Sequence, residues 1–187
     1  MTLSFSLPPP GVVAVLLIVA LAAAVYDVRY RRIPNLLTFG GVLVGLGLNG
    51  FLDQGRPGLF VSSLLGLAIA FVVYFVLYAL RAMGAGDVKL MAAVGAIVGW
   101  RDWFGIFIVT AIIGGILALI LVAVRGRVKK TLWNVAFILS ELKGGRPAYM
   151  RREELDVKNP KALGLPHGAV IAVGTMFFLA MAAHFAR

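Results

Sequence analysis

The chain has 187 residues, of which 61% are hydrophobic and only 14% are charged. Soluble domains carry about 25% charged residues, and a soluble protein of this size lacks the polar surface to cover so much apolar side chain. An integral membrane protein is therefore expected. The absence of cysteine excludes disulfides and cysteine-based zinc sites. The net charge of +10 fits either a nucleic-acid partner or basic cytoplasmic loops.

Apolar runs follow one another along the chain, and a spanning helix needs about 20 such residues. No basic residue precedes the first run, so we expect a retained helix rather than a signal peptide. The fourth run is short and rich in glycine. The predicted fold is an all-α polytopic membrane protein whose residues 1–187 form one membrane-embedded domain. The six predicted transmembrane helices cover residues 11–26, 36–52, 59–80, 87–100, 103–124 and 167–186.

Lys and Arg residues predict the orientation, because cytoplasmic loops are enriched in them. With the N-terminus outside, the cytoplasmic segments 27–35, 81–89 and 125–165 hold 15 of the 18 basic residues. The predicted topology is therefore N-out and C-out. Because this topology accounts for the positive charge, we expect no nucleic-acid partner.

The last cytoplasmic segment, the basic loop 125–165, begins with the amphipathic sequence VKKTLWNVAFILSEL at 128–142. This sequence is too short and too charged to span a bilayer, and we expect a helix lying on the inner leaflet. Glycine pairs at Gly41/Gly45 and Gly95/Gly99 form small-xxx-small patterns, which predict close helix packing.

Two of the eight acidic residues stand out by their position. Asp27 ends the first predicted helix and Asp87 opens the fourth, so both fall at the cytoplasmic edge of the bilayer. An ionisable residue at this depth usually faces a bundle interior or a wet cavity. In the alternative, each acid is an interfacial charge paired with Arg29 or Arg81.

Two carboxylates at one depth can share a proton and activate water, as in aspartic proteases. No protein nucleophile is then needed, and His167 and His184 fall on opposite sides of the membrane in the predicted topology. The helix macrodipole favours negative charge at a helix N-terminus and disfavours it at a C-terminus. We therefore expect the shared proton to reside mainly on Asp27 rather than on Asp87.

Two sequence blocks around these acids resemble those of prepilin peptidases. DVRYRRIPN at 27–35 resembles their D-x-R-x-x-x-I-P-N block, and GAGDVK at 84–89 resembles their G-x-G-D-x-K block. LPHGAVIAVG at 165–174 is similar to the opening of the family's last helix. The resemblance covers most of the chain. It implies a membrane aspartic endopeptidase that removes the basic leader from prepilin precursors at the cytoplasmic face of the inner membrane.

The resemblance also implies site residues. Asp27 and Asp87 would be the catalytic pair, with no metal or cofactor, and Gly84 and Gly86 would permit a tight bend before Asp87 and let the substrate backbone approach. The remaining matches are supporting positions. These are Arg29, Pro34, Asn35 and Lys89.

The chain is compact compared with many members of that family. They carry a cysteine-containing cytoplasmic insert and also N-methylate the mature pilin, whereas this chain has no cysteine. We therefore expect peptidase activity without N-methylation, and the compact form resembles the peptidases of Flp-type (tight-adherence) pili or archaeal preflagellin peptidases. The expected partners are a prepilin or pseudopilin precursor and the lipid bilayer.

A non-enzymatic membrane scaffold or a small proton-coupled transporter is the alternative. A proton relay needs ionisable groups through the bilayer, and no Asp, Glu, Lys or Arg lies in the middle of a predicted span. This observation argues against a transporter but leaves the scaffold open.

Overall fold

The computed structural model describes residues 7–55, 57–126, 128–143 and 166–185, and every regular element in these ranges is an α-helix. The predicted all-α class is confirmed, and most helix ends lie within three residues of the predicted ones. The helices are α1 (Pro10–Tyr30), α2 (Asn35–Leu52), α3 (Leu59–Ala79), α4 (Ala85–Val98), α5 (Trp100–Val124), α6 (Val128–Lys143) and α7 (His167–Phe185).

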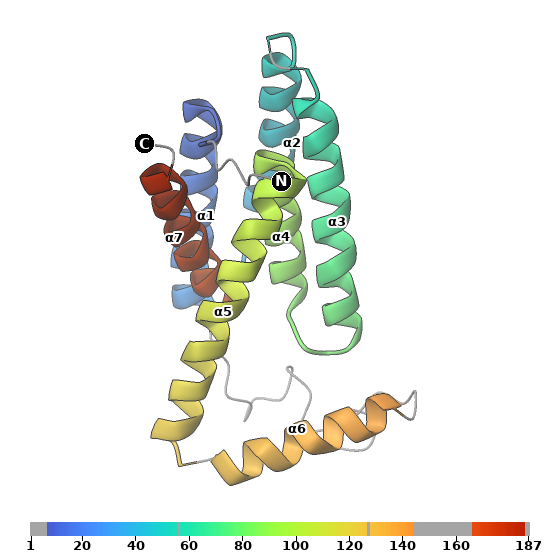
Figure 1. Ribbon diagram of the computed structural model, residues 1–187, viewed down its shortest axis with the longest axis vertical. Helices are drawn as coiled ribbons and strands as arrows, with labels where there is room; N and C mark the ends of the chain where they lie inside the picture. Colours follow the sequence, from blue (N-terminus) through green and yellow to red (C-terminus); the bar gives the residue numbers. More distant parts are fainter. Residues whose placement is uncertain (1–6, 56, 127, 144–165, 186–187) are drawn as a thin grey trace.

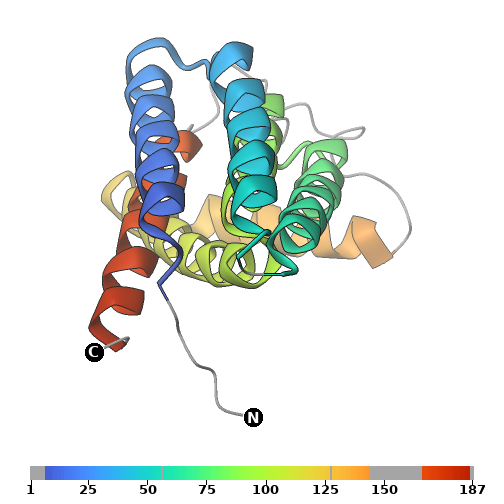
Figure 2. The ribbon, with the colours of Figure 1, turned by 90° about the horizontal axis from the view of Figure 1, so that it is seen from above.

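Six of these helices run along the length of the bundle, whereas α6 lies across one end of it (Figure 1). Seen from above, α1, α2 and α3 stand side by side in chain order (Figure 2). The C-terminal end of α1 and the N-terminal ends of α4 and α7 lie at the same end of the bundle (Figure 1). The helix predicted at 128–142 is confirmed as α6, while residues 144–165 of the basic loop lie outside the described ranges.

Five described helices are long and apolar enough to cross a membrane, namely α1, α2, α3, α5 and α7. The fourth predicted span is different, because α4 has 14 residues and is about 21 Å long, against about 30 Å of hydrocarbon. Five of the six predicted spans are therefore candidate spans in the structure, and the remaining one is a shorter helix. The chain is a multi-pass membrane protein by its apolar helices.

The short helix α4 forms the centre of the bundle. Nine of its residues are buried, compared with three in the much longer α5. It packs most extensively against α3 and α2. The other helices expose many large apolar side chains, as expected for surfaces that face lipid.

Glycines allow α4 to approach its neighbours closely. A Cβ added at Gly66 of α3 would collide with the backbone of Gly95 in α4, and one at Gly45 of α2 would lie 2.9 Å from the Ala96 carbonyl oxygen. The packing role predicted for the two glycine pairs is confirmed, since Gly41 also faces Val19 and Ala93. The contribution of Gly66 was not predicted.

Polar side chains from two neighbouring helices cap the C-terminal end of α4. The buried amide of Asn49 in α2 donates to the Ile97 carbonyl at 2.8 Å, and the buried hydroxyl of Ser63 in α3 donates to the Ala96 carbonyl. The last carbonyls of a helix have no intrahelical donor. Here the Ala96 and Ile97 carbonyls are satisfied inside the protein, immediately before α5 begins at Trp100.

We predict that Gly66→Ala destabilises the protein by about 1–3 kcal/mol, because the new methyl group overpacks the α3–α4 contact. Gly47→Ala is the matched control, since a Cβ there meets nothing within 4 Å and alanine favours a helix by about 1 kcal/mol over glycine. Thermal unfolding in detergent measures both. Equal melting temperatures for the two variants would contradict the close contact.

Candidate active site

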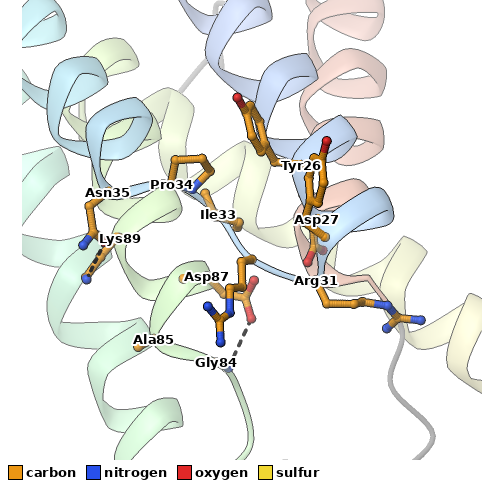
Figure 3. Close-up of a pocket in the computed structure, with 13 residues that line it drawn as sticks. Tyr26, Asp27, Arg31, Ile33, Pro34, Asn35, Gly84, Ala85, Asp87 and Lys89 are labelled. Atoms are coloured by element: carbon orange, nitrogen blue, oxygen red, sulfur yellow. Dashed lines mark hydrogen bonds between the residues drawn. The ribbon is translucent and has the colours of Figure 1, made fainter.

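A cavity of about 670 Å³ opens at the end of the bundle where α1 ends and α4 begins. Its walls come from the last turn of α1, the connection 31–34, the start of α2 and the first turn of α4. Both predicted acids line it, Asp27 from α1 and Asp87 from α4 (Figure 3). The structure therefore brings two carboxylates that are sixty residues apart in sequence to the walls of one cavity.

Asp27 lies one turn before the end of α1, which continues to Tyr30 rather than ending at 26 as predicted. Its side chain is 9% exposed, and its Oδ2 accepts a 2.7 Å hydrogen bond from the backbone N–H of Gly168. Gly168 belongs to the first turn of α7, where N–H groups have no intrahelical acceptor. The start of α7 thereby fixes the position of this acid.

Asp87 is the third residue of α4 and is half-buried. Its Oδ2 accepts a 3.2 Å hydrogen bond from the backbone N–H of Gly84, the residue that precedes the helix. A side chain at this position that reaches back to the N-cap N–H is half of a capping box. This local contact holds one carboxylate oxygen, and the residue still borders the cavity.

The macrodipole argument that placed the shared proton on Asp27 was incomplete, and the location of that proton stays a prediction. It considered only the helix to which each acid belongs. Asp27 sits in the last turn of α1 but touches the N-terminal turn of α7, so both acids lie against a helix N-terminus. Such termini favour negative charge, and the dipoles no longer distinguish Asp27 from Asp87.

The glycines before Asp87 do not make the predicted bend by conformational freedom. Gly84 has φ −82° and ψ 153°, which is extended backbone open to any residue, and Gly86 does not have positive φ. The prediction of a glycine-dependent bend is wrong. The glycines instead leave space: a Cβ at Gly84 would lie 3.4 Å from Asp87 Oδ2, and one at Gly86 would make ordinary contacts with Ile33.

The supporting residues of the first block occupy different places. Pro34 immediately precedes α2 in an extended conformation. Asn35 begins α2, and its Oδ1 accepts a 2.8 Å hydrogen bond from Lys89 Nζ of α4 (Figure 3). Arg29 does not line the cavity, and its guanidinium lies 5.8 Å from the ring centre of Tyr30. Arg31 and Arg32 line the cavity instead.

Gly168 and Ile33 are among the residues at this site that were not predicted. Gly168 holds Asp27, and Ile33 lies between the first turns of α4 and α7, close to both Gly86 and Gly168. A Cβ at Gly168 would lie 3.0 Å from Asp27 Cβ and 3.2 Å from Ile33 Cδ1. Both residues lie in the sequence blocks that resemble prepilin peptidases, and this position was the one hint of a role at the site. Their contact partners are distant in sequence.

A family model described as the type IV leader peptidase family matches residues 14–119, which is more than half of the chain and includes both acids. The chain therefore belongs to this family, and the predicted kinship with prepilin peptidases is confirmed.

Curated relatives agree with this assignment. Proteins named prepilin leader peptidase/N-methyltransferase are 31% identical over 116 residues in Xanthomonas campestris and 28% identical over 125 residues in Myxococcus xanthus. These matches cover 56% and 63% of this chain but only 38% and 36% of the relatives. Prepilin peptidase EppA of Methanothermobacter thermautotrophicus is 34% identical over 89 residues, which are 44% of this chain and 23% of that protein. No solved structure matches the chain significantly.

The matched region is thus less than half the length of these relatives. Those from Xanthomonas and Myxococcus carry a methyltransferase name as well as a peptidase name. The expectation of peptidase activity alone stays a prediction.

We predict that Gly168→Ala and Asp27→Ala are energetically coupled. The added methyl group would lie 3.1 Å from Asp27 Oδ2, so Gly168→Ala should cost less stability when the carboxyl group is already removed. Residues in direct contact show coupling energies of about 0.5–3 kcal/mol. A double-mutant cycle on unfolding free energies measures the coupling, with Gly115→Ala as the control because a Cβ there meets nothing within 4 Å. Additive effects at Gly168 would contradict the predicted contact.

Proposed function

We propose that the protein is a membrane aspartic endopeptidase that cleaves the basic leader from prepilin-like precursors, with Asp27 and Asp87 as its catalytic pair. The observation that carries this proposal is the convergence of these two acids on one open cavity. Family membership and the names of the relatives support the choice of substrate. We further propose that the compact chain acts on Flp-type pilins.

The proposed chemistry needs only water and the two carboxyl groups. One carboxylate takes a proton from water as the water oxygen attacks the scissile carbonyl carbon, while the other carboxyl group donates its proton to the carbonyl oxygen. The tetrahedral intermediate then collapses, the C–N bond breaks, and the leaving amine takes up a proton from the dyad. Because the acids act as a pair, their protonation belongs to the pair rather than to either residue.

The cavity walls hold both acids in fixed positions, as this reaction requires. Asp27 is buried and fixed by Gly168, whereas Asp87 is half-buried and fixed by Gly84. Gly86 lines the cavity without a side chain, which would let an extended substrate backbone pass close to Asp87. Such positioning of a peptide bond against fixed groups contributes a large part of enzymatic rate enhancement.

We propose that this end of the bundle faces the cytoplasm and that the protein resides in the inner membrane. The distribution of Lys and Arg supports an N-out and C-out topology, with α4 completing the bundle as a short sixth transmembrane element. The helix α6 exposes Leu132 and Trp133 and lies across this end of the bundle (Figure 1). These features support a position on the inner leaflet.

We predict that Asp27→Asn and Asp87→Asn each reduce prepilin cleavage in proteoliposomes by at least about 10²–10⁴-fold, because each removes an acid–base group. Asp53→Asn is the matched control. Asp53 follows α2 at the opposite end of the bundle, and its Oδ1 accepts a hydrogen bond from the Phe60 N–H that an asparagine oxygen can also accept. Full cleavage by either cavity variant would reject the proposed dyad.

We predict that Gly86→Ala lowers kcat/KM for prepilin by about tenfold or more without lowering the melting temperature. The structure has room for the methyl group beside Ile33, so the free enzyme should accept it, whereas a substrate backbone against Asp87 should not. Steady-state kinetics and thermal unfolding on the same preparation separate the two effects. Unchanged kinetics would show that no substrate backbone approaches Gly86.

A further inference from the structure

A second hollow, of about 460 Å³, lies on the flank of the bundle between α2 and α3. We call it the flank groove. Its volume falls within the range of about 300–1,000 Å³ that is typical of ligand sites. Apolar side chains form most of its walls, and Ala92 of the central α4 also borders it. The walls include Phe39 and Val42 from α2 and Leu67 and Phe71 from α3.

The flank groove adjoins the cavity lined by Asp27 and Asp87, which we call the acid cavity. Asn35 and Lys89 line both spaces, and they are joined to each other by the 2.8 Å hydrogen bond between Lys89 Nζ and Asn35 Oδ1. This bond therefore marks the boundary between a cavity with two carboxylates and a hollow whose surface is mainly apolar. A chain leaving the acids toward α2 and α3 would pass this bond first and the apolar walls next.

The flank groove opens toward the surroundings of the bundle. Phe39 and Phe71 are 65% and 47% exposed, and both belong to helices apolar enough to cross a membrane. The cavity around the acids is more polar, with Arg31 and Arg32 in its walls. The two adjoining hollows thus differ in chemistry: charged side chains line the one at the acids, and apolar side chains line most of the one between α2 and α3.

We propose that the flank groove binds an apolar segment of the peptide substrate that lies directly beside the scissile bond. This inference rests on the proposed function, and it assigns a specificity role to Val42 and Leu67. The substrate class is a peptide with polar residues on one side of the cleaved bond and an apolar run on the other. The groove is continuous with the acid cavity, which favours this occupant over a lipid acyl chain. Binding of a lipid chain would not require an apolar groove that leads to the two acids.

The size of the effect is limited by the environment. An apolar segment gains little by moving from lipid to an apolar wall, because lipid tails are equally apolar, so shape and close packing must supply the preference. Filling the groove should therefore weaken substrate binding rather than the chemical step. We expect KM to change and kcat to stay nearly constant, as for a loss of uniform binding.

The test compares Val42→Trp and Leu67→Trp, which fill the groove, with Val44→Trp. Val44 is 51% exposed and lies two residues along α2, about 200° round the helix from Val42. Each enzyme is assayed with a prepilin carrying its apolar segment and with a peptide truncated to the residues that flank the bond. Melting temperatures identify any variant that fails to fold, and two groove variants keep the test decisive.

We expect the groove variants to raise KM for the long substrate about tenfold, a typical effect of one group in an apolar pocket, and to leave KM for the truncated peptide unchanged. Val44→Trp should change neither. Equal effects on both substrates, or no effect on either, would overturn the inference while leaving the dyad intact. If the wild-type protein cleaves neither substrate, the proposed function itself fails and the groove proposal with it.

A photo-crosslinking residue at Phe71, placed in the Asp87→Asn background, gives a readout independent of cleavage. Adducts with the apolar segment of the long substrate are the expected result. Adducts with lipid alone, at saturating substrate, would identify the flank groove as an acyl-chain site and overturn the proposal.

Discussion

The capping of α4 inside the bundle is the interaction on which the architecture depends. A helix that ends within a membrane leaves carbonyl groups that water cannot satisfy, at a cost of several kcal/mol for each unsatisfied group. The Asn49 amide and the Ser63 hydroxyl supply the missing donors at the C-terminal end of α4. With these two carbonyls satisfied, α4 can be shorter than a bilayer and largely buried, and still present Asp87 at the opposite end of the bundle.

The two acids belong to two differently built groups of helices. Asp87 stands on α4, which is clamped by glycine contacts to α2 and α3, whereas Asp27 stands on α1, which packs mainly on α7 and is held there by Gly168. Contacts between α4 and the pair α1 and α7 are less extensive. The two acids therefore sit at a seam between two groups, and Ile33 fills part of that seam beside both first turns. Relative motion of the groups would change the spacing of the acids.

Hydropathy was sufficient to predict the helices and the meeting of the two acids at one end of the bundle, because membrane spans impose strong local patterns. The partners of the acids were beyond such patterns. Gly168 binds Asp27 across 141 residues, and nothing local to either residue encodes that contact. The same limit explains the error about the glycines: a glycine before a helix suggests a bend, but the backbone at Gly84 is extended in the structure.

A peptidase at a membrane edge must reconcile two opposed needs. Hydrolysis requires water and charge at the scissile bond, whereas an apolar stretch of substrate is costly to draw into water, at about 25 cal/mol per Å² of exposed apolar surface. The Lys89–Asn35 hydrogen bond lies where these environments meet, with the acids on one side and the apolar walls between α2 and α3 on the other. In our proposal, the substrate stays anchored in the apolar region while only its cleaved bond enters the wet cavity. The short, buried α4 makes this possible, because it lines both spaces within two turns: Asp87 faces the cavity, Ala92 borders the groove, and Lys89 lines both.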